Sequence, residues 1–178
     1  MRQNAIRDMT YIAVCVALMA ICSWIMIPSS PPFTLQTLAV FLAVGLLGGR
    51  RGTTAVVVYL LLGAVGLPVF AGFTGGLGIL LGSTGGYFLG FLCTGLLMWA
   101  MEHLSIDPRH LLPLSMLLGL LACYAFGTAW YMAMYLRTTG PISLITVLGW
   151  CVAPFIIPDL AKIALALLIL RRVKKYVS

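Results

Sequence analysis

The stretch PFIIPDLAKIALALLIL, residues 154–170, places an acid and a base inside an apolar run. Asp159 and Lys162 are the only charged residues between Arg137 and Arg171. Because they are three residues apart, they are neighbours on one face of a helix. Lys162 precedes Arg171 by nine residues, about 13.5 Å along a helix that rises 1.5 Å per residue. The lysine is therefore expected near the middle of a membrane-spanning helix.

The composition predicts an integral membrane protein. Of the 178 residues, 62% are hydrophobic and 8% are charged, and the mean hydropathy is +1.09, whereas a soluble domain carries about 25% charged residues. We expect one membrane domain over residues 1–178, with the five cysteines buried as small apolar side chains. The net charge of +7 would suggest nucleic acid in a soluble chain, but here we assign it to loops and expect no nucleic-acid partner.

Six apolar runs are long enough to cross a hydrocarbon core about 30 Å thick, which requires roughly 20 helical residues. They are residues 9–27, 33–49, 53–71, 83–101, 111–136 and 142–170. The segments between these runs are expected to interrupt the helices. Examples are the proline-rich PSSPP at 28–32 and the charged turn RRG at 50–52. The sequence thus predicts an all-α bundle of six transmembrane helices in the lipid bilayer.

The basic residues predict that both termini are cytoplasmic. With an inside N-terminus, nine basic residues fall in inner segments and only Arg137 falls outside, which is a strong positive-inside bias. The nine are Arg2, Arg7, Arg50, Arg51, Arg109, Arg171, Arg172, Lys174 and Lys175.

The charged pair in the last run has two interpretations. A charge near the bilayer centre costs at least about 2.5–3.5 kcal/mol, so Asp159 and Lys162 must face the bundle interior or a wet cavity. The pair could simply staple the bundle, but an ionisable residue inside a membrane indicates a functional site by default. Pro154 and Pro158 favour a functional site, because each removes a helical donor and frees carbonyl groups for a ligand.

Other polar and aromatic residues collect in the half of the spans that this orientation places outside. Thr34 and Gln36 open the second span, and STGGY at 83–87 opens the fourth after a glycine-rich loop. Trp130 and Trp150 lie in the outer parts of the last two spans. Taken singly, Thr34 is a helix cap and the tryptophans are interfacial residues. Together they predict an outer pocket covered by flexible loops, with no comparable polar trail towards the inside.

Small residues four apart allow helices in lipid to approach closely. Three such pairs are Gly45 with Gly49, Gly82 with Gly86, and Gly86 with Gly90, for which internal packing is expected. Ala13 and Ala17 form another pair in the first span. Their spacing alone leaves open an internal seam or a partner helix.

Five segments resemble the BioY family, the biotin-specific S components of energy-coupling-factor transporters. They are PFTLQTLAVFLAVGLLGGRRG (32–52), YLLLGAVGLPVFAG (59–72), GGLGILLGSTGGYFLGF (75–91), YAFGTAW (124–130) and PFIIPDLAK (154–162). The order is the expected one and the match covers nearly the whole chain. Two positions depart from the family pattern. The family usually has Gly where this chain has Pro158, and it often has Pro where this chain has Ser83. Neither departure removes a charged or aromatic group, so the expected substrate class is unchanged.

The resemblance implies a six-helix protein of a prokaryotic plasma membrane that captures biotin from outside. It further implies delivery through an energising module made of one transmembrane coupling protein and two ATPases. The acid and the lysine that bind biotin in the family correspond to Asp159 and Lys162. The AxxxA surface that docks on the coupling protein corresponds to Ala13 and Ala17, which favours a partner surface for that pair.

Biotin combines a ureido ring, an apolar body and a carboxylate. Asp159 can accept hydrogen bonds from the ureido N–H groups, and Lys162 can donate to a carbonyl or a carboxylate. The other expected pocket residues are Thr34, Gln36, Thr84 and Tyr87 as polar contacts, Gly85 and Gly86 as points of close backbone approach, and Trp130 and Trp150 as apolar walls. No metal and no cofactor is expected.

Two other classes of function fit the sequence less well. A membrane enzyme would need clustered acids, whereas Asp8, Glu102 and Asp107 fall at the inner side, so we expect no enzyme. A stand-alone, proton-coupled secondary transporter often has internal repeats, and none is convincing here. Because a lone Asp–Lys pair can still move a proton, this transporter is the alternative. No P-loop GxxxxGK[ST] is present, so ATP would have to be used by a partner.

Overall fold

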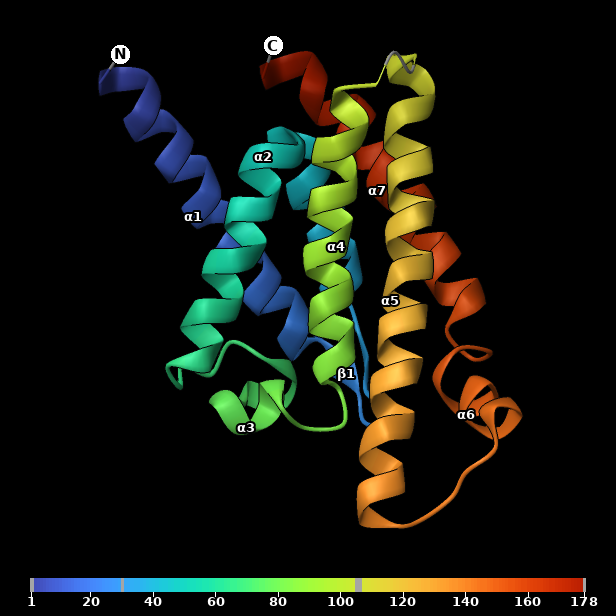
Figure 1. Ribbon diagram of the computed structural model, residues 1–178. Helices are drawn as coiled ribbons and strands as arrows, with labels where there is room; N and C mark the ends of the chain where they lie inside the picture. The colour runs from blue at the N-terminus through green and yellow to red at the C-terminus, as the bar shows by residue number, and fades with distance from the viewer. Residues whose placement is uncertain (1, 30, 105–106, 178) are drawn as a thin grey trace.

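The computed structural model describes residues 2–29, 31–104 and 107–177, and this part of the chain is mainly helical (Figure 1). The helices are α1 Arg2–Trp24, α2 Gln36–Ala64, α3 Leu77–Leu80, α4 Gly85–Glu102, α5 Pro108–Thr138, α6 Leu144–Cys151 and α7 Ile156–Val177, with the 3-10 turn η1 Ala71–Phe73. Strands β1 Met26–Ile27 and β2 Phe33–Thr34 pair as a short antiparallel hairpin. Helix is present in each of the six predicted apolar runs.

Helix α2 is a hairpin of two arms that meet at Gly48. This glycine has φ 77° and ψ 174°, a left-handed conformation that favours glycine. The Nε2 atom of Gln36 lies 2.7 Å from the Tyr59 hydroxyl, 23 residues later, although these residues would be about 34 Å apart in a straight helix. The prediction of a turn at RRG, residues 50–52, is therefore wrong, because the turn lies at Gly48. The RRG segment lies in the second arm, whose first N–H, on Gly49, donates to Glu102 Oε1 over 2.8 Å.

The two ends of the bundle differ (Figure 1). Helix α1 begins, α2 turns and α7 ends at one end, which we call the terminal end. The β1–β2 hairpin, η1, α3 and α6 lie at the opposite end, the loop end. At the terminal end, Arg51 Nη2 lies 2.9 Å from Asp8 Oδ2 and joins α1 to the second arm of α2.

Helix α4 packs against both α2 and α5. A Cβ atom on Gly86 or Gly90 would collide with the backbone of α5 at Phe126 or Cys123. These glycines therefore allow two helices to pack closely, as expected from their spacing. Helix α1 packs on α2, and α7 packs on α2 and α5, so that α2 lies at the centre of the contacts.

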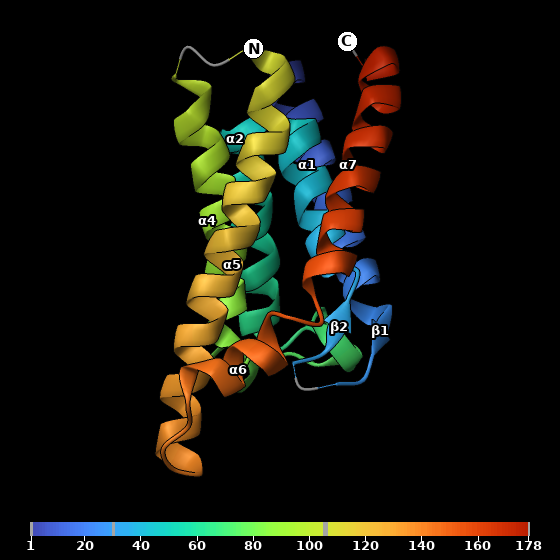
Figure 2. The same ribbon diagram turned by 90° about the vertical axis from the view of Figure 1, so that its right-hand side faces the viewer.

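The last predicted span, 142–170, is broken into α6 and α7, which meet at an angle of 44°. Residues 152–155 form a turn, and Pro154 lies in it. Pro158 lies in the first turn of α7, where a missing N–H costs little because it has no partner in the helix. Figure 2 shows α6 lying across the loop end, between the lower parts of α5 and α7. The break starts α7 just before Asp159.

By length and composition, three helical segments in the described residues can span a membrane. They are Ala5–Trp24, Gln36–Ala64 and His110–Thr138, and the bent pair α6–α7 makes a fourth if it is one span. Large apolar side chains are exposed on the outside of several helices, including Val14, Leu61, Leu121 and Leu168. A soluble monomer rarely exposes so much apolar surface, so these helices fit a lipid environment.

Candidate functional site

A cavity of about 290 Å³ lies towards the loop end of the bundle. Its walls come from the β2 strand and the start of α2, from η1 and α3, from α4 and α5, and from the α6–α7 break. Most of its lining is apolar or aromatic. The polar lining residues are Thr34, Gln36, Thr37, Thr74, Thr84, Asp159 and Lys162. The aromatic lining residues are Phe70, Tyr87, Phe88, Phe91, Tyr124 and Phe155. This arrangement is typical of small-molecule sites.

The charged pair of α7 lines this cavity. Lys162 Nζ lies 2.8 Å from Asp159 Oδ1, and the two residues are only 6% and 4% exposed. The spacing of three residues puts both side chains on one face of the helix, as predicted. Two charges so deeply buried require each other and further hydrogen bonds, because each alone would carry a large desolvation cost.

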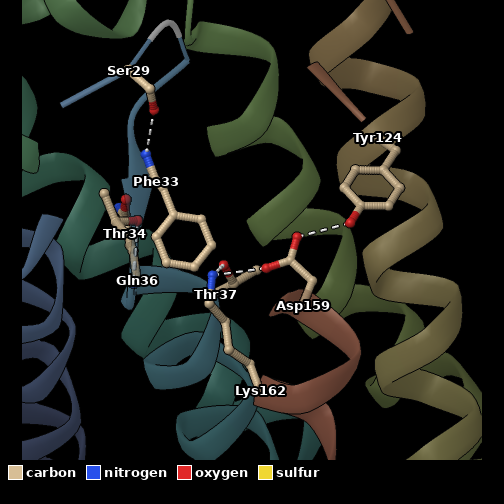
Figure 3. Close-up of polar contacts among 8 residues, drawn as sticks. All are labelled: Ser29, Phe33, Thr34, Gln36, Thr37, Tyr124, Asp159 and Lys162. Atoms are coloured by element: carbon tan, nitrogen blue, oxygen red, sulfur yellow. Dashed lines mark hydrogen bonds and ion pairs between the residues drawn. The ribbon is translucent and has the colours of Figure 1, made fainter. Parts of the chain in front are cut away.

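Side chains from two other helices complete the surroundings of the pair (Figure 3). The Tyr124 hydroxyl of α5 donates to Asp159 Oδ2 over 2.8 Å. Lys162 donates to Thr37 Oγ1 of α2 over 3.3 Å, and its ammonium lies 4.3 Å from the centroid of the Phe33 ring. Each carboxylate oxygen thus has one donor, which leaves acceptor capacity on both oxygens, since a carboxylate has about four lone-pair sites.

Four further predicted residues line the cavity: Thr34, Gln36, Thr84 and Tyr87. Thr34 Oγ1 accepts a hydrogen bond from the Gln36 backbone N–H over 3.3 Å, although the N-cap position of α2 is occupied by Leu35 and not by Thr34. The Tyr87 hydroxyl donates to the carbonyl oxygen of Cys151 over 3.2 Å and joins α4 to the end of α6.

The predicted close-approach glycines and apolar walls lie elsewhere. Gly85, Gly86, Trp130 and Trp150 are not among the cavity-lining residues. The Trp130 indole N–H donates to the carbonyl of Gly82 over 2.8 Å, and a Cβ on Gly85 would lie 2.9 Å from this nitrogen. Trp150 is 47% exposed and lies beside Tyr135 on the outside. In this structure Phe70, Phe88, Phe91 and Phe155 supply the apolar walls instead.

Ala13 and Ala17 are exposed on α1 and do not line the cavity. In the part of the chain that the structure describes, no group of three or more His, Cys, Asp or Glu side chains is arranged to hold a metal ion.

A family comparison decides where the chain belongs. The BioY family model matches residues 1–178. The chain belongs to the BioY family. It is 37% identical to the biotin transporter BioY of Thermotoga maritima, over 95% of this chain and 96% of the relative. It is 35% identical to the probable biotin transporter BioY of Pyrococcus horikoshii, over 94% of this chain and 96% of the relative.

A solved structure gives the same answer for the fold of this BioY family member. The chain is similar to the crystal structure of the S-component for biotin from an ECF-type ABC transporter. The TM-score is 0.84 and the identity is 29%, with 98% of this chain and 94% of the other covered.

Three residues that line the cavity of this BioY chain were not predicted from the sequence: Tyr124, Thr37 and Phe155. Phe33, which contacts Lys162 but does not line the cavity, was not predicted either. Each lies inside a segment that carried the family resemblance, and Phe33 and Thr37 flank the predicted Thr34 and Gln36. An aromatic residue within an apolar span gives no signal of its own, because the same letter also serves core packing. Only the helix contacts bring Tyr124 to Asp159.

Proposed function

We propose that this chain is the biotin-binding S component of an ECF-type vitamin transporter. It captures biotin in the cavity and delivers it through an ATP-driven energising module. The observation that carries the proposal is the buried Asp159–Lys162 pair on the cavity wall of a chain from the BioY family. The role is that of a transport protein and involves no catalysis.

The cavity offers groups that complement biotin. The free acceptor positions of Asp159 suit ureido N–H donors, and the remaining donor of Lys162 suits a carbonyl or a carboxylate. Phe70, Phe88 and Phe155 supply apolar surface for the bicyclic body. The ligand can therefore join the existing hydrogen bonds without breaking the ion pair.

We infer six membrane crossings: α1, the two arms of α2, α4, α5, and α6 with α7. We place the terminal end in the cytoplasm of a prokaryotic cell, because Arg7, Arg50, Arg51, Arg171 and Arg172 belong to the segments at that end and the positive-inside rule applies. The side chains of Arg2, Arg109, Lys174 and Lys175 lie outside the described residues. With this orientation the cavity lies in the outer half of the plasma membrane, on the side from which the vitamin arrives.

The energising module is proposed as one coupling protein and two ATPases. Ala13 and Ala17 supply the docking surface, since both are exposed on α1 and small residues let a partner helix approach closely. A tightly held ligand is released only if the partner binds a second conformation better. We infer that docking on α1 shifts the bundle towards that conformation.

The function is tested by titrating the purified protein with biotin and measuring the fluorescence of its four tryptophans. Tight saturation in the wild type, lost in Asp159→Asn and Lys162→Ala, is the expected result. A folded, ligand-free wild type that does not bind biotin contradicts the substrate. Uptake in whole cells that survives deletion of the ATPases but stops when the proton gradient collapses supports a stand-alone transporter instead.

A further inference from the structure

A buried chain of hydrogen bonds begins at Gln36 on the cavity wall. The Gln36 Nε2 atom donates to the Tyr59 hydroxyl over 2.7 Å. The Tyr59 hydroxyl donates to the carbonyl oxygen of Val69 over 2.8 Å. Gln36 is 5% exposed and Tyr59 is fully buried, so water does not compete for these bonds.

The donor and the acceptor of each of these hydrogen bonds follow from the number of protons available. A carbonyl oxygen only accepts, so the single proton of the Tyr59 hydroxyl must go to Val69. The tyrosine oxygen can then only accept from Gln36, and the only donor on the glutamine side chain is its NH2 group. The amide oxygen of Gln36 is therefore directed away from Tyr59.

Two features hold Tyr59 in this position. The Ser23 hydroxyl of α1 lies 2.6 Å from the same Val69 carbonyl oxygen and 2.7 Å from the Ala20 carbonyl oxygen, which share its single proton. The Trp24 indole donates to the neighbouring Pro68 carbonyl over 2.8 Å. The Tyr59 ring packs edge-on against Phe70, with centroids 5.5 Å apart. The acceptor for the Tyr59 proton is thus fixed by α1 and by the segment that follows α2.

We propose that Tyr59 is a positioning residue that makes Gln36 a hydrogen-bond acceptor towards the cavity. Gln36 lines the cavity, and its amide oxygen is the group left to face a ligand. A ligand with an N–H donor is selected at this point, and a ligand without one leaves the buried oxygen unpaired, which is costly. This rests on the proposed function in one respect: the ureido N–H groups of biotin are the donors that Gln36 would accept.

A double-mutant cycle between Tyr59→Phe and Gln36→Ala tests the proposal. Tyr59→Phe keeps the ring and removes the hydroxyl, so the amide is free to rotate. We expect the Kd for biotin to rise about tenfold, or 1.4 kcal/mol. In the Gln36→Ala background the same change is expected to alter the Kd by less than about twofold, because coupled residues are not additive. Equal effects in both backgrounds overturn the proposal.

Trp24→Phe is the matched control, because it removes the donor to the neighbouring Pro68 carbonyl, which anchors the segment after α2, without removing a partner of Gln36 or of the Tyr59 hydroxyl. If Trp24→Phe weakens biotin binding as much as Tyr59→Phe does, the Tyr59 hydroxyl acts by anchoring the segment after α2, and the proposal is wrong. Thermal melting without ligand compares the stability of all variants, so that unfolding is not mistaken for lost binding.

A panel of biotin, desthiobiotin and lipoate separates this proposal from the proposed function. Lipoate has no N–H group, whereas desthiobiotin keeps the ureido group. Binding of desthiobiotin but not of biotin would contradict the proposed substrate, and the cycle would then be run with desthiobiotin. Binding of lipoate alone, or of none of the three, overturns the role assigned to Gln36 as well.

Discussion

The Lys162 ammonium lies 4.3 Å from the centroid of the Phe33 ring, so the charge of α7 contacts the β1–β2 hairpin. Phe33 also stacks with Phe155 in the α6–α7 break, with centroids 6.0 Å apart. The hairpin, the break and the charged pair are therefore held together at one point. The Phe33 N–H is fixed in turn by the Ser29 hydroxyl over 3.1 Å.

Replacement of Phe33 is expected to weaken the contacts that hold the hairpin, the α6–α7 break and the charged pair together. Phe33→Leu removes a cation–π contact worth about 0.5–2 kcal/mol and should increase the rate of biotin dissociation several-fold. Stopped-flow fluorescence measures that rate. Phe73→Leu is the control, because Phe73 is 63% exposed and stacks on Trp24 outside the cavity. An equal increase in both variants would argue against a special role for Phe33.

Tyr124→Phe is expected to weaken biotin binding about three- to tenfold, because a hydrogen bond to a charged group contributes roughly 1.5–3 kcal/mol and part of it is shared with the Lys162 contact. The Tyr124 hydroxyl donates to Asp159 Oδ2, and in the proposed site this bond would orient the carboxylate towards the ligand. Tyr131→Phe on the same helix is the control, since its ring stacks with Tyr135. An unchanged affinity in Tyr124→Phe would mean that Lys162 alone orients the carboxylate.

The ion pair predicts a specific pattern of stability. Lys162→Met leaves Asp159 as a buried charge without its cation and should destabilise the protein by about 3–5 kcal/mol, whereas replacing both partners by apolar residues can be neutral. The double variant Asp159→Leu with Lys162→Met should therefore melt at a higher temperature than Lys162→Met alone. Thermal unfolding in detergent gives the comparison, and a double variant that melts below the single one contradicts it.

Gly90→Ala is expected to destabilise the bundle, because the added Cβ would collide with the Cys123 backbone on α5. Gly149→Ala is the matched control, since nothing lies within 4 Å of its added Cβ. The fraction of monodisperse protein after heating in detergent is the measurement. Equal survival of the two variants would show that α4 and α5 can separate at little cost.

Ala13→Trp with Ala17→Trp should abolish biotin uptake in whole cells while leaving biotin binding to the purified protein unchanged. The bulky rings would keep a partner helix away from the exposed α1 surface. Leu117→Trp with Leu121→Trp has the same spacing on exposed positions of α5 and should leave uptake intact. Loss of uptake in both pairs would point to a general defect in the membrane.

The sequence predicted the parts of the molecule that composition and local chemistry decide. The six helical runs and the pairing of Asp159 with Lys162 follow from hydropathy and from helical spacing. The turn of α2 at Gly48 was not predicted, because two adjacent arginines are a stronger sequence indicator of a loop than a single glycine. The turn nevertheless requires the glycine, which has φ 77°. The α6–α7 break was only hinted at by Pro154.

The site was harder to predict, because it depends on contacts between helices. Gln36 and Thr84 were found from their polarity at the start of an apolar run. Trp130 was misplaced as a cavity wall because an outer tryptophan can equally well hold a loop, as its bond to Gly82 does. Tyr59 could not be predicted, since its hydroxyl acquires a role only when the α2 hairpin brings it to Gln36.

The break before α7 has an electrostatic consequence for the cavity. Three helices begin at this cavity. Gln36 is the first residue of α2, and Thr84 and Phe155 directly precede α4 and α7; all three residues line the cavity. Each helix start carries the equivalent of about half a positive charge and each helix end about half a negative charge. Among the longer helices of the described residues, only α6 ends at the cavity, at Cys151, and the Asp159–Lys162 pair is neutral overall. The cavity thus has a positive bias without an excess of basic side chains, which favours a vitamin that carries a carboxylate.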